Sequence, residues 1–323
     1  MPILSTYNLA IGYGKAKTKS IVQQGLNLQL FKGEMVCLLG PNGCGKSTLM
    51  RTLAGIQKAH EGKITIDGKS IAEYTQKEIA LKIALVLTDR VEVENATVWD
   101  IVALGQHPYT RWIGGMTEKG KAKIKDAIRL VNLEHFTSRL FGSLSDGEKQ
   151  RVMIAKALAQ DTPLIFLDEP TAHLDLPNRV EIMMLLHKLA HETGKAIIIS
   201  THELDMALQA ADRIWLMKSR GGVVSGVPED LVLNGTFNEV FKSDAYYFNA
   251  TNGNFSMNYT LSKKISVSSQ DKTKLYWTFR ALARAGFSVE NKAKDHIEIT
   301  EKGWMYNDKL YESIESLLGE LDG

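Results

Sequence analysis

Short apolar runs alternate with helical segments along the first two hundred residues. Continuous apolar runs, in contrast to alternating ones, are typical of parallel strands that are buried on both faces. The runs are MVCLLG (35–40), KIALVLT (82–88), PLIFLD (163–168) and AIIIST (196–201). This pattern predicts an α/β core whose sheet is mixed but mainly parallel.

Two other patterns accompany these runs. LNLQLFKGE (26–34) alternates apolar and polar residues, and KITIDGKSI (63–71) does the same around the turn pair Asp67-Gly68. Such alternation predicts an antiparallel β subdomain near the N-terminus, with Asp67-Gly68 as a hairpin turn. Between about residues 90 and 160 the apolar spacing becomes helical, as in VWDIVALG (98–105), which predicts a helical subdomain.

The character of the chain changes after residue 233. Strand-like FSMNYTL (255–261) and KKISVSS (263–269) precede a predicted helix over 273–286, and segments 288–293 and 296–303 are expected to pair as strands. The apolar residues expected to share one helix face are Leu275, Phe279 and Leu282, then Leu310, Ile314, Leu317, Leu318 and Leu321 in the last helix. We therefore predict a domain over residues 1–233 and a small α+β domain over 234–323.

Composition narrows the classes of function. Lys and Arg number 39 against 37 Asp and Glu, and the resulting net charge of +2 is too small to favour nucleic acid as a partner. No basic, apolar and small-residue sequence opens the chain, so we expect no signal peptide. The apolar runs are much shorter than the roughly 20 residues that span a bilayer. Work at a membrane would therefore require a partner that is embedded in it.

The first chemical motif lies between a predicted strand and a predicted helix. GPNGCGKST (40–48) fits the pattern GxxxxGK[ST], in which glycines let backbone N–H groups turn inward around phosphates. Lys46 is expected to reach the β- and γ-phosphates, and Ser47 to offer its hydroxyl to Mg²⁺. The predicted nucleotide-binding residues of this loop are Gly40, Pro41, Asn42, Gly43, Cys44, Gly45, Lys46, Ser47 and Thr48.

The two cysteines, Cys37 and Cys44, do not make a disulfide framework. Cys37 is typical of a small apolar residue in a buried strand. Cys44 stands beside a helix N-terminus, where the pKa of a thiol tends to fall, and such a thiol would suit a redox switch. The alternative, which we favour, is a loop residue that is selected for its size.

A second motif supplies acidic residues. PLIFLDEP (163–170) ends a buried strand with two carboxylates, Asp168 and Glu169. Consecutive side chains at a strand end diverge, so one can face a metal ion while the other faces the attacking water. Asp168 is therefore the expected Mg²⁺ ligand, and Glu169 is the expected general base.

A third motif repeats the features of an anion site. In LSDGEKQRVMIAKAL (144–158), Ser145 and Gly147 precede a predicted helix, so a hydroxyl, backbone N–H groups and a helix dipole again come together. One nucleotide requires only one phosphate cradle. The second cradle therefore predicts contact with the nucleotide of another subunit.

In their order along the chain, GPNGCGKST, LSDGE, LIFLDEP, TAHLD and STHE resemble the motifs of the ATP-binding cassette (ABC) family. LSDGE is similar to the family's LSGGQ signature, with Asp146 and Glu148 as departures. The resemblance covers roughly residues 1–232. It implies a P-loop NTPase fold and ATPase activity, with two copies that close head-to-tail around two ATP molecules and Mg²⁺.

The resemblance also implies roles for single residues. Those expected to face the ATP of the partner subunit are Ser145, Gly147 and Glu148. Asp175, in TAHLD, would link the two sites across the dimer interface, and His202, in STHE, would contact the γ-phosphate. Tyr13, in LAIGYG, falls where the family places an aromatic ring that stacks on adenine. The alternative for Tyr13 is a tyrosine that packs on the sheet.

One departure from the family concerns Thr88, which stands where a glutamine usually touches Mg²⁺ and the attacking water. Three alternatives remain open: Thr88 acts through a bridging water, Asp89 replaces it, or coupling to a transporter is altered. Gln106 is too far along the chain to be a simple replacement. We favour the bridging water, which makes Ser47, Asp168 and Thr88 the expected residues around the metal.

The segment VWDIVALGQHPYTRW (98–112) resembles the branch of the family that serves iron–siderophore, haem and cobalamin importers. This implies the ATP-binding subunit of an importer, held peripherally at the cytoplasmic face of the inner membrane. The implied partners are a second copy, integral permease subunits and, indirectly, a substrate-binding protein. His107 has no second ligand at metal spacing, so we expect it to have a structural or interface role.

Two rival functions remain. The first is a soluble ABC ATPase without a permease, such as the iron–sulfur cluster assembly type. The second makes residues 235–323 the working end, as a ligand-sensing module for which the ATPase is an actuator. Association with an integral membrane protein would discriminate the first rival from an importer.

Overall fold

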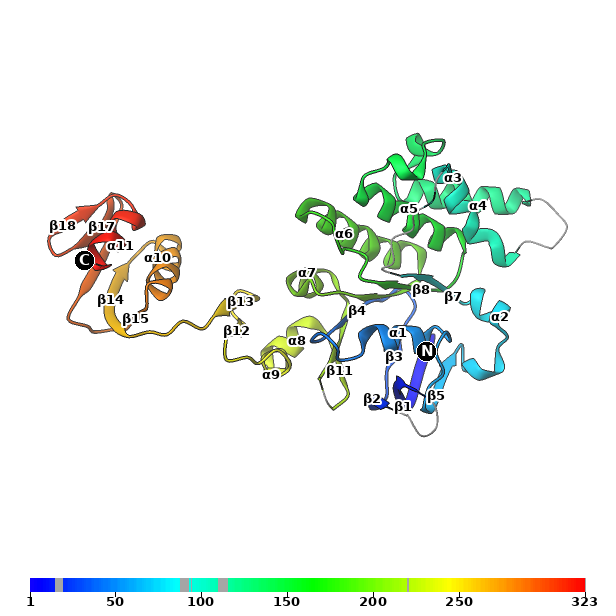
Figure 1. The fold of residues 1–323 in the computed structure, drawn as a ribbon, viewed down its shortest axis with the longest axis horizontal. Coiled ribbons are helices and arrows are strands. Elements are labelled where there is room, and N and C mark those ends of the chain that lie inside the picture. Colours follow the sequence, from blue (N-terminus) through cyan, green and yellow to red (C-terminus); the bar gives the residue numbers. More distant parts are fainter. Residues whose placement is uncertain (15–19, 88–92, 94, 110–115, 220, 323) are drawn as a thin grey trace. The chain divides into compact units, whose positions relative to one another are not determined.

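The computed structural model describes residues 1–14, 20–87, 93, 95–109, 116–219 and 221–322 of the 323-residue chain. Its contacts divide the chain into two compact units, each of which we describe by itself (Figure 1). The larger unit contains Met1–Phe241 with Ala250–Asn254, and the smaller contains Lys242–Asn249 with Phe255–Gly323.

The larger unit contains a six-stranded sheet in the order β11-β10-β4-β9-β8-β7. The strands are β4 (Met35–Leu39), β7 (Ile83–Val86), β8 (Leu164–Asp168), β9 (Ala196–Ser200), β10 (Arg213–Met217) and β11 (Val223–Gly226). All neighbours are parallel except the edge strand β11, which is antiparallel to β10. Every residue of β4, β8 and β9 is buried, which explains their continuous apolar runs. The parallel sheet that the sequence predicts is confirmed.

A second sheet of the larger unit is antiparallel, with order β2-β1-β5-β6 and β3 paired to β1. Its strands are β1 (Leu4–Tyr13), β2 (Ser20–Leu26), β3 (Gln29–Leu30), β5 (Glu61–Ile66) and β6 (Lys69–Ser70). Ile66 pairs with Lys69, which leaves Asp67 and Gly68 as a two-residue hairpin turn. Both turn residues have positive φ, 49° and 80°, as the common two-residue hairpin turn requires.

Helices cover the two sheets. The described α-helices of the larger unit are α1 (Lys46–Leu53), α2 (Gln76–Ala80), α3 (Val98–Ala103), α4 (Glu118–Leu130), α5 (Asp146–Ala159), α6 (Leu176–Thr193), α7 (Leu204–Ala210), α8 (Pro228–Leu233) and α9 (Thr236–Val240). Short 3-10 helices cover Ile71–Glu73, Leu104–Tyr109, Glu134–Phe136 and Phe141–Ser143. Figure 1 shows α3, α4 and α5 gathered beside β7 and β8, which matches the helical subdomain expected there.

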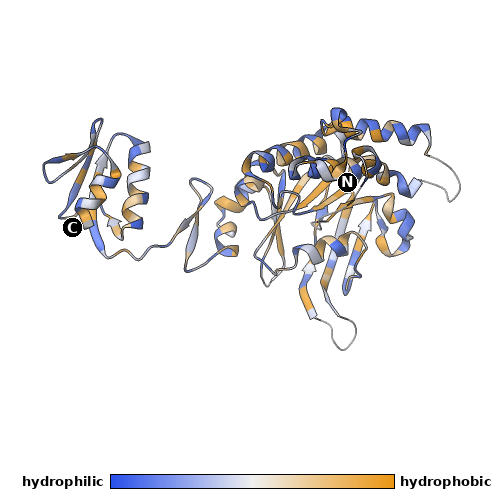
Figure 2. Cartoon of the chain, turned by 45° about the horizontal axis from the view of Figure 1, so that its top comes forward, coloured by the Kyte–Doolittle hydropathy of each residue, from blue (hydrophilic) through white to orange (hydrophobic). Residues whose placement is uncertain are grey.

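The main core lies between the two sheets, with α1 inside it. Leu49 and Leu53 of α1 belong to the same buried cluster as Leu4 of β1 and Phe166 of β8. In Figure 2 the hydrophobic colour concentrates on the strands of this unit. The loop that joins β4 to α1 therefore connects two elements whose side chains belong to this buried cluster.

The smaller unit is built on a five-stranded sheet in the order β15-β14-β16-β17-β18. Its strands are β14 (Lys263–Ser269), β15 (Phe287–Val289), β16 (His296–Thr300), β17 (Gly303–Tyr306) and β18 (Lys309–Tyr311), and its helices are α10 (Lys272–Arg284) and α11 (Ile314–Asp322). A separate two-stranded sheet joins β12 (Tyr246–Asn249) and β13 (Asn254–Met257). The five-stranded sheet and these two helices form an α+β unit, as the sequence predicts. Its core includes Ile265, Leu282, Ile297 and Leu317.

Three details of this unit were predicted wrongly. Segments 288–293 and 296–303 do not pair, because β14 lies between β15 and β16 and is parallel to both. Phe279 is 39% exposed, since the buried face of α10 is formed by Thr278, Ala281 and Leu282. Leu310 is 40% exposed and lies in β18, one element before the helix to which its apolar character assigned it.

Candidate functional site

The loop between β4 and α1 has a backbone that only glycine adopts readily. Gly40, Gly43 and Gly45 have φ of 154°, 75° and 109°. A Cβ at Gly40 would lie 2.5 Å from the Met217 carbonyl oxygen, and one at Gly45 would lie 2.6 Å from Val22 Cγ1. A Cβ at Gly43 would meet nothing within 4 Å, so the loop borders open space at this glycine. The arrangement fits a backbone cradle for an anion.

Lys46 begins α1 and is 7% exposed. Its Nζ donates to the carbonyl oxygens of Gly40 at 2.9 Å and Pro41 at 3.3 Å. Burial lowers the pKa of Lys46, and the nearby Cys44, Glu169 and Asp168 oppose part of this effect. Among the described residues the hydrogen-bond partners of this buried ammonium are neutral carbonyl oxygens, so a bound anion such as a phosphate would stabilise it.

Cys44 is 3% exposed, in the middle of the loop. Burial raises the pKa of its thiol, and the charge of Lys46 opposes this only in part. The expectation of a lowered thiol pKa is therefore wrong, because desolvation outweighs the helix terminus. Cys37 behaves in the same way, since burial and then Asp212 raise its pKa to about 12. Both cysteines are packing residues.

Asp168, the last residue of β8, is 6% exposed and meets two hydroxyl groups. Its Oδ1 lies 3.4 Å from Ser47 Oγ and accepts a hydrogen bond from Ser200 Oγ. Carboxylate and hydroxyl oxygens are hard ligands of the kind that Mg²⁺ prefers. Ser47 and Asp168 come from α1 and β8, so the structure brings together the two residues that the sequence proposes for the metal.

Glu169 follows Asp168 with a φ of 51°, a conformation that a non-glycine residue rarely adopts. Its N–H donates to the Ser200 carbonyl oxygen at 3.0 Å. Its Oε1 lies 2.9 Å from Nε2 of His202, just beyond the end of β9. Both side chains are partly exposed, 32% for Glu169 and 44% for His202. Glu169, the expected base, and His202, expected to contact the γ-phosphate, therefore contact each other at the edge of the sheet where β8 and β9 end.

Tyr13 ends β1 beside α1. Its hydroxyl contacts Thr48 Oγ1, and the residue is 57% exposed. A tyrosine that packed on the sheet would be buried. The observed position keeps the ring near the loop and open to solvent, as a stacking role requires.

Ser145 caps α5, and the Glu148 carboxylate accepts hydrogen bonds from the N–H and the hydroxyl of Ser145. Glu148 Oε2 accepts from Ser145 N at 2.7 Å and from Ser145 Oγ at 2.8 Å, while Ser145 Oγ accepts from Glu148 N at 3.3 Å. The backbone hydrogen bond from Ser145 is the main cause that lowers the pKa of Glu148, with the Ser145 hydroxyl and Arg139 adding to it. Sequence reasoning missed this reciprocal cap, although Ser-x-x-Glu before a helix is its known pattern.

Asp175 caps α6 and accepts from Asn178 N at 3.2 Å and Asn178 Nδ2 at 2.6 Å. A Cβ at Gly147 would lie 2.5 Å from Asn178 Oδ1. The start of α5 and the start of α6 therefore touch at Asn178, and a larger residue at position 147 would require the Asn178 amide to move. This contact joins the Ser145 turn to Asp175 within one chain.

Thr88, Asp89 and Arg90 lie outside the described residues. Gln106 is 4% exposed, and its Nε2 donates to the Ala159 carbonyl oxygen at the end of α5. Its amide therefore serves to join the Leu104–Tyr109 turn to α5.

Comparison with known proteins identifies relatives of this chain. Residues 23–172 match the ABC transporter family, and residues 262–322 match the iron ABC transporter C-terminal domain. An uncharacterised ABC transporter ATP-binding protein of Methanocaldococcus jannaschii is 41% identical over 239 residues, which cover 74% of this chain and 81% of that protein. The chain belongs to the ABC transporter family.

Other members of the ABC transporter family agree with this assignment. The iron(3+)-hydroxamate import ATP-binding protein of Bacillus subtilis is 34% identical over 245 residues, covering 76% of this chain and 90% of the relative. A dimeric ATP-binding cassette solved with ADP and Pi has a TM-score of 0.60 at 29% identity, covering 70% of this chain and 98% of the cassette. The predicted family, α/β fold and ATPase activity are confirmed. None of the described helices has the length and apolar character of a membrane span.

Proposed function

We propose that this ABC ATPase energises the uptake of iron chelates, haem or cobalamin through a membrane permease. The meeting of Lys46, Ser47, Asp168, Glu169 and His202 at one sheet edge supports ATP hydrolysis. The match of residues 262–322 to an iron transporter domain supports the iron branch. Relatives named for import favour this function over a cassette that works without a permease.

Each residue of the site has a separate role in the proposed reaction. The loop over Gly40–Gly45 and Lys46 binds the phosphates of ATP. Ser47 and Asp168 would hold Mg²⁺, which neutralises phosphate charge when bound. Glu169 accepts a proton from the attacking water, and His202 orients its carboxylate through the 2.9 Å contact.

The proposal includes partners. Two copies would bind head-to-tail, so that Ser145, Gly147 and Glu148 of each face the ATP of the other. The dimer would dock on integral permease subunits at the cytoplasmic face of the inner membrane and serve, indirectly, a substrate-binding protein. This arrangement accounts for the second phosphate-facing turn at Ser145, which a monomeric ATPase does not need.

Uptake assays test the proposal. Cells that lack the gene are given radiolabelled ferric hydroxamate, haem or cobalamin, and complemented with the wild-type chain or with Glu169→Gln. We expect the deletion to abolish uptake of one of these compounds, the wild type to restore it, and the variant to fail. Normal uptake of all three compounds in the deletion strain would refute the cargo class.

A further inference from the structure

Away from the nucleotide site, α6 carries two histidines at helical spacing. His187 and His191 are one turn apart, and their ring centroids lie 4.4 Å from each other. Asp212, between α7 and β10, supplies a third group. One potential ligand atom from each of these three residues lies within 4.8 Å of the other two.

Asp212 is fixed by the parallel sheet. Its backbone N–H donates to the Met35 carbonyl oxygen at 3.0 Å, and its Oδ2 accepts from Met35 N at 2.7 Å. Its Oδ1 then lies 3.0 Å from Nε2 of His191. Because β4 anchors both the backbone and the carboxylate, this oxygen is held in place before any ligand binds.

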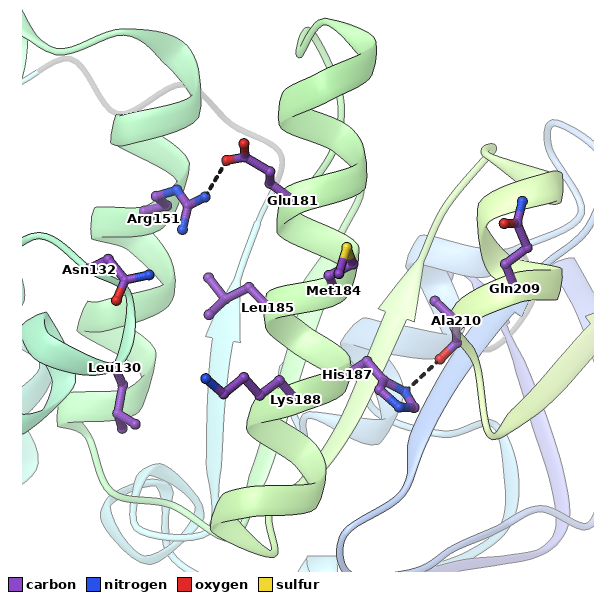
Figure 3. A pocket seen from close by; sticks show the side chains of 10 residues that line it. All are labelled: Leu130, Asn132, Arg151, Glu181, Met184, Leu185, His187, Lys188, Gln209 and Ala210. Atoms are coloured by element: carbon purple, nitrogen blue, oxygen red, sulfur yellow. Dashed lines mark hydrogen bonds and ion pairs between the residues drawn. The ribbon is translucent and has the colours of Figure 1, made fainter.

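His187 is oriented by α7. Figure 3 shows its ring directed toward Ala210, and its Nδ1 lies 2.8 Å from the Ala210 carbonyl oxygen. Since a carbonyl oxygen only accepts, the neutral ring that fits this contact carries its proton on Nδ1 and offers the lone pair of Nε2. Histidines that bind metals are typically fixed by such a bond from the other ring nitrogen.

We propose that His187, His191 and Asp212 bind one divalent transition-metal ion of the Zn²⁺, Co²⁺ or Fe²⁺ class. Two imidazoles and a carboxylate favour these ions over Mg²⁺ or Ca²⁺. Metal bonds of about 2.0–2.1 Å in a tetrahedral site place ligand atoms about 3.3 Å apart. The His191–Asp212 distances of 3.0 and 3.2 Å are already close to this value.

The site is open to solvent. The side chains of His191 and Asp212 are 49% and 28% exposed. His187 also borders a pocket of about 510 Å³, lined in part by Arg151, Met184 and Lys188 (Figure 3). Three protein ligands leave at least one coordination position for water, and the exposure gives a metal ion an entry path.

Binding would connect three elements. The ion would tie α6, which begins after Asp175, to the segment between α7 and β10. His202 lies just before α7. A bound metal would therefore restrain the helices that follow Asp175, the interface candidate, and His202, the residue expected to contact the γ-phosphate.

Metal titration tests the inference on the full chain, stripped with EDTA and free of nucleotide so that Mg²⁺-type binding at the loop is weak. We expect Co²⁺ to bind once per chain with visible ligand-field absorption and to raise the melting temperature. His187→Gln and His191→Gln should each weaken binding at least ~10-fold, the scale on which loss of a mere outer hydrogen-bond partner weakens metal sites. Mg²⁺ at the same concentration should produce neither signal.

Matched variants complete the test. His135→Gln changes an exposed histidine outside the cluster and should bind Co²⁺ like the wild type. Asp212→Asn keeps an oxygen for Met35 N but removes the charge, so it should remain folded and bind Co²⁺ weakly. Absence of Co²⁺ binding by the wild type, or equal binding by all variants, would overturn the proposal and leave His191 and Asp212 as a hydrogen-bonded pair.

Discussion

Two helix starts in this ATPase are proposed to face phosphate, and their N-termini are capped differently. The start of α1 has no side-chain cap and follows glycines at positive φ, so the chain itself leaves the anion position open. The start of α5 has a complete reciprocal cap, in which the Glu148 carboxylate takes both donors of Ser145. We expect the first to accept an anion as it stands, whereas the Glu148 carboxylate already occupies the second.

The difference has a consequence for assembly. An N-cap contributes typically ~1 kcal/mol, so a phosphate from a partner subunit can replace part of it at modest cost. The α1 site is therefore expected to bind ATP in a monomer, whereas the α5 site is expected to act only in a closed dimer.

The largest effect is expected from Glu169→Gln, which leaves both helix starts intact. Loss of a general base costs about 10²–10⁴-fold in rate, while ATP binding at α1 should be nearly unchanged. Steady-state hydrolysis and nucleotide affinity measure the two properties separately. Glu192→Gln, an exposed glutamate on α6, is the control. Hydrolysis at the parent rate in Glu169→Gln would remove Glu169 from the reaction.

Ser145→Arg should disable the α5 side alone. A long cation in place of the hydroxyl blocks the partner's phosphate, and loss of such a donor typically costs about 10²–10³-fold in rate. Binding of a fluorescent ATP analogue by the monomer should match the wild type, because α1 is untouched. Loss of this monomer binding would show that the two helix starts are not independent.

Truncation tests whether the larger unit and ATP binding at α1 depend on the C-terminal region. Phe237 of α9 is fully buried, so removal of residues from 236 onward should destabilise the larger unit by about 3–5 kcal/mol. A cut after Phe241 should keep this core and leave ATP binding at α1 unchanged. Thermal unfolding and nucleotide binding of the two truncations measure this, and equal stability would contradict it.

Glu148→Gln is expected to strengthen ATP-dependent dimerisation slightly, in contrast to the loss of function expected for Ser145→Arg. Glutamine keeps the reciprocal cap but removes a negative charge that opposes the partner's phosphate. A charge at a helix terminus is worth about 0.3–1 kcal/mol, so ATP-dependent dimerisation should tighten about 2–5-fold. Analytical ultracentrifugation with ATP measures the change. Weaker dimerisation of this variant would mean that the charge assists closure.

Acid should act on the same carboxylate. Hydrogen bonds to Ser145 lower the pKa of Glu148 below its ordinary value. A depressed pKa means that the ionised cap stabilises the folded chain above the ordinary glutamate pKa and that this contribution disappears as pH falls through the lowered value. The difference in stability between wild type and Glu148→Gln should therefore shrink in acid, and a difference that grows would contradict the assignment.

The strand, glycine turn and helix at the start of α1 were predictable because these parts are neighbours in the sequence. The apolar strand β4, the glycines at positive φ and Lys46 follow one another along the chain, although Met217 and Val22 also pack closely against Gly40 and Gly45. The ends of β8 and β9 were also predictable, since adjacent parallel strands bring Asp168 and Ser200 to one edge.

The failures have different physical causes. Phe279 and Leu310 were assigned to cores because apolar character alone does not show which side of an element is covered. The order β15-β14-β16 depends on long-range pairing that no local pattern contains. Glu148 was treated as a departure from LSGGQ, although its effect on Ser145 is a capping interaction that the local sequence could reveal.

The most direct test of a shared site mixes two defective chains. In the Glu169→Gln background, which retains bound ATP, Lys46→Ala removes the α1 side of one chain and Ser145→Arg removes the α5 side of the other. The account predicts that neither chain alone forms an ATP-bound dimer, whereas the mixture gives dimers that retain one ATP each after gel filtration. ATP-bound dimers formed by Ser145→Arg alone, or none in the mixture, would contradict it.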